Sequence, residues 1–124
     1  MQLKTIRDIL AAEPELAVLI GSRADGTARP DSDWDIALQW SRDLGFMERL
    51  AATEQLRNTL AKGMDVPETA VDLIDLPSAR MAMRAVIAEE GILLKGLENP
   101  AWHRFLLRTW RELEELYWEQ IYAA

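Results

Sequence analysis

Two aspartates occupy alternate positions of a run that otherwise has the pattern of a buried strand. In the stretch GSRADGTARPDSDWDIAL (residues 21–38), Asp33 and Asp35 lie on either side of Trp34. Side chains of a strand alternate between its two faces, so both carboxylates are predicted to point to the same side. Like charges this close repel each other, and burying them without a partner is costly. The pattern therefore predicts a cation between them, and Mg²⁺ prefers oxygen ligands of this kind.

A glycine-serine pair and a third aspartate add to this pattern. Gly21 and Ser22 follow an apolar run, where free N–H groups and the hydroxyl can hold phosphate oxygens. Asp72 lies within a further strand-like run, VDLIDL (residues 71–76), whereas Asp75 is predicted to point the other way and to serve in a turn. Taken alone, Gly-Ser is usually a turn and Asp-x-Asp usually a solvated strand face. Together, three carboxylates on two strands that face a Gly-Ser turn describe a two-metal site for phosphoryl transfer.

The rest of the chain alternates between helical and strand-like patterns. Apolar spacings of three and four predict helices over residues 2–12, 43–62, 78–90 and 100–122. Short apolar or alternating runs predict strands over residues 15–20, 33–40 and 70–76, with a short strand or extended segment at 92–95. Residues 22–32 form a loop or begin a helix. Ser78 is predicted to cap the third helix, and Gly63 to end the second. This order predicts one α/β or α+β domain.

Two of the predicted helices carry apolar stripes. The stripe of the second helix consists of Leu44, Met47, Leu50, Ala51, Leu56 and Leu60. The last helix has a seam predicted to pack on the domain, formed by Trp102, Leu106, Trp110, Leu113 and Tyr117. Three further aromatic residues lie partly off this seam: Phe105, Trp118 and Tyr122. The extra apolar surface either completes an intramolecular core or anchors a partner protein.

The composition of the chain argues against several classes of protein and of binding site. A chain of 124 residues with 49% apolar and 28% charged residues is typical of a globular domain. No apolar run approaches the roughly 20 residues of a membrane span, and the N-terminal pattern is not that of a signal peptide. The absence of cysteine excludes disulfides and thiolate metal sites. A net charge of -7 argues against direct nucleic-acid binding. We expect a cytoplasmic protein without a nucleic-acid or membrane partner.

The spacing of these residues resembles a known family. Gly21-Ser22, ten residues and Asp33-Trp34-Asp35 reproduce the GS-x10-DxD motif of the polymerase-beta-type nucleotidyltransferases, in particular their minimal (MNT) branch. VDLIDL is similar to the family's third-carboxylate strand, in which the first aspartate is functional. The resemblance covers residues 15–95. It implies the nucleotidyltransferase fold, a small mixed sheet flanked by helices. One domain would then span residues 1–124, with its core over 15–95 and a C-terminal helix over 100–122.

The length, VDLIDL and the segment GILLKG (residues 91–96) look most like the MNT antitoxins that are paired with HEPN-domain toxins in type VII-like systems. Such antitoxins transfer AMP from ATP to a tyrosine of the toxin ribonuclease. The resemblance implies that two Mg²⁺ ions are held by the catalytic residues Asp33, Asp35 and Asp72. In this scheme Asp72 also acts as, or orients, the base. The nucleotide phosphates would be bound by Gly21, Ser22, Arg23 and Arg29, although both arginines could equally be solvated loop residues.

Two alternative functions use the same residues differently. A small-molecule nucleotidyltransferase, of the aminoglycoside type, would have the same site, but the short chain leaves little room for a separate substrate domain. A non-catalytic antitoxin that acts by binding alone would not need the aspartates, all three of which are present.

Overall fold

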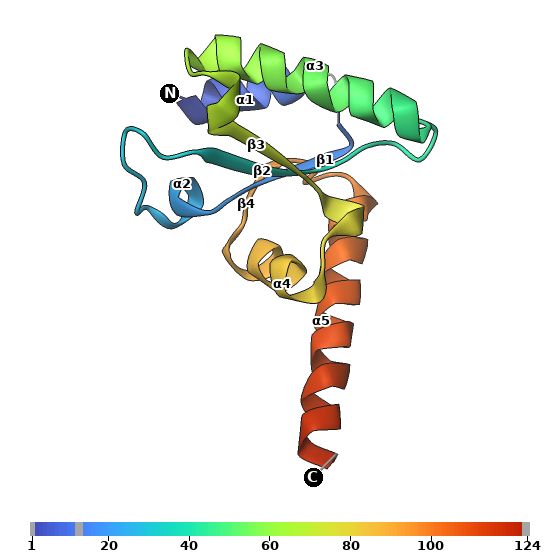
Figure 1. Ribbon diagram of the computed structural model, residues 1–124. Coiled ribbons are helices and arrows are strands. Elements are labelled where there is room, and N and C mark those ends of the chain that lie inside the picture. Colours follow the sequence, from blue (N-terminus) through green and yellow to red (C-terminus); the bar gives the residue numbers. More distant parts are fainter. Residues whose placement is uncertain (1, 12–13, 123–124) are drawn as a thin grey trace.

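The computed structural model describes residues 2–11 and 14–122 and has a mixed α/β architecture (Figure 1). The helices are α1 (Gln2–Leu10), α2 (Ser22–Asp25), α3 (Phe46–Met64), α4 (Met81–Glu90) and α5 (Pro100–Tyr122). The strands are β1 (Leu16–Ile20), β2 (Trp34–Gln39), β3 (Val71–Asp75) and β4 (Ile92–Lys95). Short 3-10 helices, η1 (Glu68–Ala70) and η2 (Leu76–Ser78), lie on either side of β3. The predicted order of elements is confirmed, although residue 12 of the first predicted helix lies outside the described residues.

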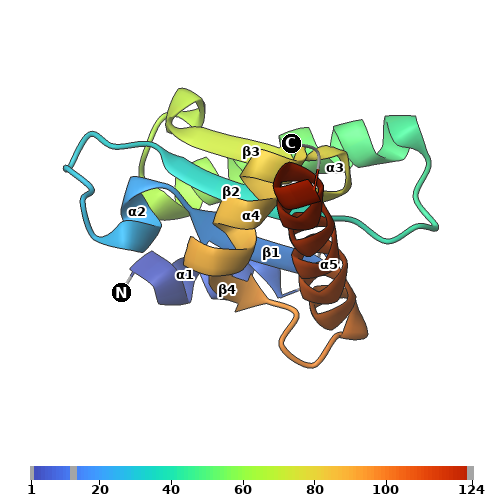
Figure 2. The ribbon, with the colours of Figure 1, turned by 90° about the horizontal axis from the view of Figure 1, so that it is seen from below.

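The four strands form one mixed sheet in the order β3-β2-β1-β4. Strand β1 pairs antiparallel with β2 and β4, whereas β2 and β3 run parallel. Helices α1 and α3 lie on one face of the sheet, and α4 and α5 lie on the other (Figures 1 and 2). The fold predicted from the sequence, a small mixed sheet flanked by helices with a C-terminal helix, is confirmed. None of the described helices is both long and apolar enough to cross a membrane.

Alternation along β2 assigns its side chains to the two faces. Trp34, Ile36 and Leu38 are buried with residues of α1 and α3. Ala37 belongs to the second core cluster, which includes residues of α4 and α5. Asp35 alternates with Trp34 and Ile36, so its carboxylate lies on the side of α4 and α5. Since β1 is central, its residues Leu16–Ile20 are buried on both faces.

Helix α3 ends later than the sequence predicted. Gly63 lies inside the helix, and Asp65 terminates it in the left-handed conformation with φ of 56°. A Cβ on Gly63 would lie 2.6 Å from Ile9 Cδ1. Glycine at this position therefore lets α1 pack closely against α3, and it does not act as a cap.

Helix α4 also begins differently. Ser78 belongs to η2, and its hydroxyl donates to the Asp75 carboxylate. The residue before the first turn of α4 is Arg80, which makes no side-chain capping bond. The prediction that Ser78 caps this helix was wrong, because Pro77 places the serine in a separate 3-10 turn with its own acceptor.

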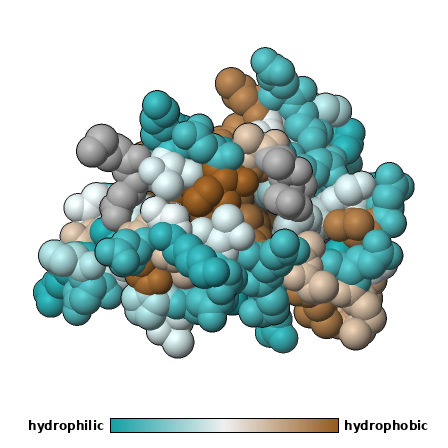
Figure 3. Space-filling model, turned by 90° about the horizontal axis from the view of Figure 1, so that it is seen from above, coloured by the Kyte–Doolittle hydropathy of each residue, from teal (hydrophilic) through white to brown (hydrophobic). Residues whose placement is uncertain are grey.

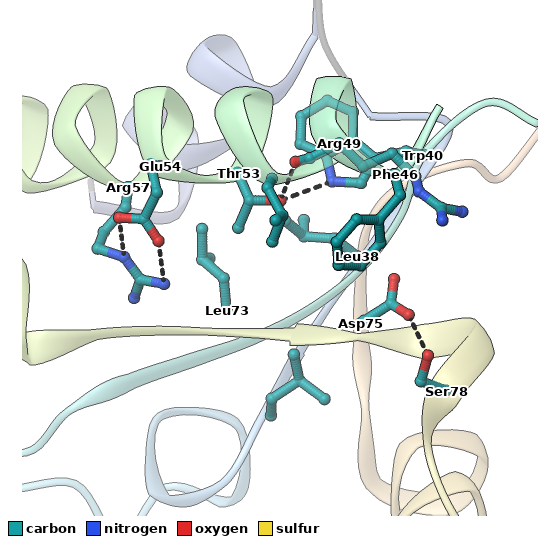
Figure 4. Close-up of a pocket in the computed structure, with 12 residues that line it drawn as sticks. Leu38, Trp40, Phe46, Arg49, Thr53, Glu54, Arg57, Leu73, Asp75 and Ser78 are labelled. Atoms are coloured by element: carbon teal, nitrogen blue, oxygen red, sulfur yellow. Dashed lines mark hydrogen bonds and ion pairs between the residues drawn. The ribbon is translucent and has the colours of Figure 1, made fainter. Parts of the chain in front are cut away.

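The predicted stripe of α3 is buried only in its second half. Met47 is 73% exposed and Leu50 is 48% exposed, whereas the buried positions are Leu56, Leu60, Ala61 and Met64. The first turns of α3 instead border an open cavity of about 480 Å³ beside β3, with Phe46 at its edge (Figure 4). From the side of α1 and α3, apolar groups are visible between hydrophilic ones (Figure 3).

Helix α5 has the predicted ends, but its packed face only partly coincides with the predicted seam. Its buried residues are Ala101, Phe105 and Thr109, and Trp110 and Tyr117 of the predicted seam are about half exposed. The predicted seam is therefore right at Trp102 and Leu106, which pack against the second core cluster, and wrong at Trp110 and Tyr117. Residues 114–122 are exposed throughout, and this half of α5 extends away from the sheet (Figure 1). An ion pair between Arg84 of α4 and Glu112 connects α5 to α4 just before this half begins.

We expect the two halves of α5 to contribute very differently to stability. Phe105→Ala removes a buried ring and should lower the free energy of unfolding by about 3–5 kcal/mol. Trp118→Ala combined with Tyr122→Ala should lower it by less than about 1 kcal/mol, because these rings stack mainly on each other. Urea denaturation of both variants measures the difference. Equal losses would contradict the packing of α5 described above.

Candidate active site

The parallel pairing of β2 and β3 brings two of the predicted aspartates together. Asp35 and Asp72 are register partners across this pair. Residues opposite each other in a sheet point to the same face, so both carboxylates lie on the side of α4 and α5. Asp33 immediately precedes β2 and is exposed, as is Asp72, whereas Asp35 is partly buried. The structure thus places all three acidic residues at the beginning of these two strands.

Asp75 lies on the opposite face of the sheet. It follows Asp72 by three positions, so the alternation of β3 turns its carboxylate toward α3. There it borders the cavity beside Phe46 and accepts the Ser78 hydroxyl (Figure 4). The placement of Asp72, and not Asp75, beside Asp35 agrees with the alternation predicted from the sequence.

The three carboxylates influence one another electrostatically. Partial burial raises the pKa of Asp35 above its ordinary value of 3.8, and the nearby charges of Asp72 and Asp33 raise it further. Among the described residues, the two ion pairs join Arg57 to Glu54 and Arg84 to Glu112, so neither involves these aspartates. The result is a local excess of negative charge that favours binding of a cation.

Gly21 brings the backbone directly against Asp35. It has φ of 74°, and a Cβ at this position would lie 2.5 Å from Asp35 Oδ2. Any larger residue would both strain the backbone and collide with the carboxylate. Ser22 follows as the first residue of α2, whose turn closes when the N–H groups of Ala24 and Asp25 donate to the Gly21 carbonyl. The Gly-Ser turn and the carboxylates are therefore neighbours, as the sequence motif predicted.

The two predicted phosphate-binding arginines are placed differently. Arg23 turns toward the loop before β2, where its guanidinium donates to the carbonyls of Pro30 and Ser32. Arg29 is exposed and has no side-chain hydrogen bond within the described part of the chain. Nucleotide binding by either residue stays a prediction. Ser32, whose carbonyl accepts from Arg23 and whose hydroxyl oxygen accepts from the Arg29 N–H, was not predicted as a site residue; its only signal in the sequence is its position directly before Asp33.

The donor set fits Mg²⁺ in chemistry. All three carboxylates offer the oxygen ligands that this ion prefers, and no cationic side chain within residues 2–11 and 14–122 neutralises them by an ion pair. In the same residues, no group of three or more acidic, histidine or cysteine side chains is already arranged around one metal position.

Asp35 is expected to destabilise the fold when it is ionised. Its folded pKa lies above the unfolded value, so the folded state binds the proton more tightly and loses stability as the pH rises through this range. Asp35→Asn removes this effect. Without Mg²⁺ at pH 7, the variant should unfold with a free energy higher than wild type by up to about 1 kcal/mol, a limit set by solvent screening.

Denaturation in urea with a chelator measures this difference. The difference in the free energy of unfolding between Asp35→Asn and wild type should shrink as the pH is lowered through 3.8, because Asp35 of the wild type is then protonated in both the folded and the unfolded state. Asp31→Asn is the matched control, since Asp31 is exposed in the preceding loop and should leave stability unchanged at both pH values. A pH-independent effect of Asp35→Asn would contradict the electrostatic explanation.

Several solved structures are similar to the whole chain. A chain in a crystal structure of a toxin-antitoxin complex with AMP-PNP is 27% identical, with a TM-score of 0.72, and the alignment covers 97% of this chain and 93% of that chain. A mutant of the MntA toxin-antitoxin complex gives 28% identity and a TM-score of 0.67, with 94% and 89% covered. A tri-AMPylated Shewanella oneidensis HEPN toxin in complex with its MNT antitoxin gives 25% identity and 0.65, with 97% and 92% covered.

These matches confirm the resemblance to MNT antitoxins that the sequence motif indicated. Comparison with curated proteins finds no match. The model of the family described as polymerase beta, nucleotidyltransferase, matches residues 4–99. This range contains the Gly-Ser turn, the three aspartates and all four strands. The chain belongs to the polymerase beta nucleotidyltransferase family.

Proposed function

We propose that this protein is the antitoxin of a HEPN/MNT pair and that it transfers AMP from ATP to a tyrosine of its HEPN toxin. The observation that carries the proposal is the pairing of Asp35 with Asp72 beside the Gly21 turn, in a nucleotidyltransferase. Structural relatives in complex with AMP-PNP and with an AMPylated HEPN toxin support the choice of nucleotide and acceptor.

In this mechanism the Gly-Ser turn and the aspartates have separate roles. Gly21 and Ser22 hold the terminal phosphates of ATP through backbone N–H groups and the serine hydroxyl. Asp33, Asp35 and Asp72 would hold Mg²⁺, which would offset phosphate charge and polarise the phosphoryl oxygens. The negative excess around Asp35 supplies the attraction for the ions.

The transfer itself is a displacement at the α-phosphorus of ATP. The tyrosine oxygen forms a bond to this phosphorus while the bond to the β-phosphate oxygen breaks, and diphosphate leaves. Asp72 accepts the tyrosine proton, because its carboxylate is exposed on the open edge strand β3 where an incoming protein side chain can reach it.

The three aspartates should be required for transfer, whereas Asp75 should not. Asp33→Asn, Asp35→Asn and Asp72→Asn should each lower the rate at least about 100-fold, since each removes charge that stabilises the transition state. Asp75→Asn is the matched control from the same strand and should keep most of the activity. Intact-mass measurement of the toxin after incubation with ATP and Mg²⁺ counts the AMP groups added.

Two outcomes of this assay would argue against the proposal. If Asp75→Asn were inactive and Asp72→Asn active, the wrong face of β3 would have been assigned. If the wild type left the toxin unmodified but transferred AMP to a small-molecule acceptor, the small-molecule alternative would replace protein modification.

The exposed half of α5 is the surface we expect the toxin to contact. Trp118 and Tyr122 stack on each other at 5.6 Å between ring centroids, and both remain accessible. Trp118→Ala with Tyr122→Ala should weaken toxin binding by about 2–4 kcal/mol, which is the scale of aromatic anchors, while ATP binding stays unchanged. Calorimetric titration with the toxin and separately with ATP measures both. Unchanged toxin affinity would place the interface elsewhere.

A further inference from the structure

Arg23 bridges the two halves of the catalytic motif. It lies in α2, one residue after Ser22, and its Nη2 atom donates to the Ser32 carbonyl at 2.9 Å and to the Pro30 carbonyl at 3.2 Å. These two acceptors precede Asp33 in the chain. The guanidinium therefore connects the turn that carries Ser22 with the segment that leads into the first catalytic aspartate.

The guanidinium of Arg23 also packs on an aromatic ring. Its Cζ atom lies 4.4 Å from the ring centroid of Trp34, whose side chain is only 4% exposed. Its Nε atom is itself buried, and no hydrogen-bond partner for it is present in the described part of the chain. Trp34 belongs to the core that includes α1 and α3, so the arginine rests on a fixed surface.

The segment whose carbonyls accept from Arg23 is a closed turn over residues 29–32. The Ser32 N–H donates to the Arg29 carbonyl at 3.0 Å, and the Arg29 N–H donates to Ser32 Oγ at 2.8 Å. Because this turn is closed on itself, fixing the Ser32 carbonyl also fixes the direction in which the chain enters Asp33. Beyond this turn, Asp33 has no hydrogen bond of its own among the described residues.

We propose that Arg23 is a positioning residue that sets Asp33 relative to the Gly21-Ser22 turn during AMP transfer. This inference rests on the proposed function. It assigns Arg23 to the loop carbonyls and not to the phosphates of the nucleotide. The role requires the planar guanidinium, which lies over the indole of Trp34 while its Nη2 atom donates to two carbonyls, and a lysine has no such planar face.

Arg23→Lys separates the two roles, because it keeps the positive charge and loses the planar guanidinium that lies over Trp34. If Arg23 positions Asp33, the Ser32 amide, which donates to the Arg29 carbonyl in this turn, should exchange hydrogen at least about tenfold faster in the metal-free protein. The kcat for AMP transfer should fall at least about tenfold, while the KM for ATP changes less than about threefold. A charge that only neutralises phosphate would predict nearly normal kcat and exchange in this variant.

Arg42→Lys is the matched control, since Arg42 is an exposed arginine beyond the other end of β2 and should change neither measurement. A melting curve of each variant establishes that it is folded at the assay temperature. The proposal is overturned if Arg23→Lys leaves exchange unchanged, if it raises only the KM for ATP, or if faster exchange leaves kcat unaffected. If the wild type transfers no AMP, the proposed function fails, and the exchange measurement alone decides whether Arg23 holds the turn.

Discussion

Parallel pairing of β2 with β3 is the constraint on which the candidate site depends. Only this pairing, in the register that sets Asp35 opposite Asp72, joins carboxylates that are 37 positions apart in the chain. A parallel connection requires a crossover, and here α3 provides it. Because α3 packs on the same face of the sheet as α1, it does not cover the carboxylates, which lie on the face of α4 and α5. The crossover thus creates the pairing and keeps the site accessible at the same time.

The site keeps an unfavourable charge arrangement that the surrounding fold tolerates. Partial burial and the charges of Asp72 and Asp33 all oppose ionisation of Asp35. The exposure of Asp33 and Asp72 to water limits the cost. Charged residues that destabilise a fold, but that the fold holds in defined positions, are typical of sites that bind a charged ligand. The close approach of Gly21 to Asp35 is part of the same arrangement, since it brings the Gly21-Ser22 turn next to the carboxylates.

The two halves of helix α5 differ in their packing: the first is joined to the core and the second is exposed. Its first half completes the core with Phe105 and is joined to α4 by the pair of Arg84 and Glu112. Its second half carries aromatic rings that contact mainly each other. The site lies at the beginning of β2 and β3, on the same face of the sheet as α5, and α5 lies toward the other ends of these strands (Figure 2). A partner held by α5 would therefore leave the carboxylates open to the segment that is modified.

The sequence by itself determined the elements and most of the site. Period-two and period-three-to-four patterns are local properties, so they predicted the strands, the ends of α5 and the orientation of Asp72. Only the tertiary structure decided which apolar faces are buried. Met47 and Trp110 fit helical stripes as well as Leu56 does, but burial depends on which other element lies opposite, and spacing along one helix does not contain that information. The same reason explains Gly63 and Arg23, whose roles come from Ile9 and from the Ser32 carbonyl, partners that lie elsewhere in the chain and are brought into contact only by the fold.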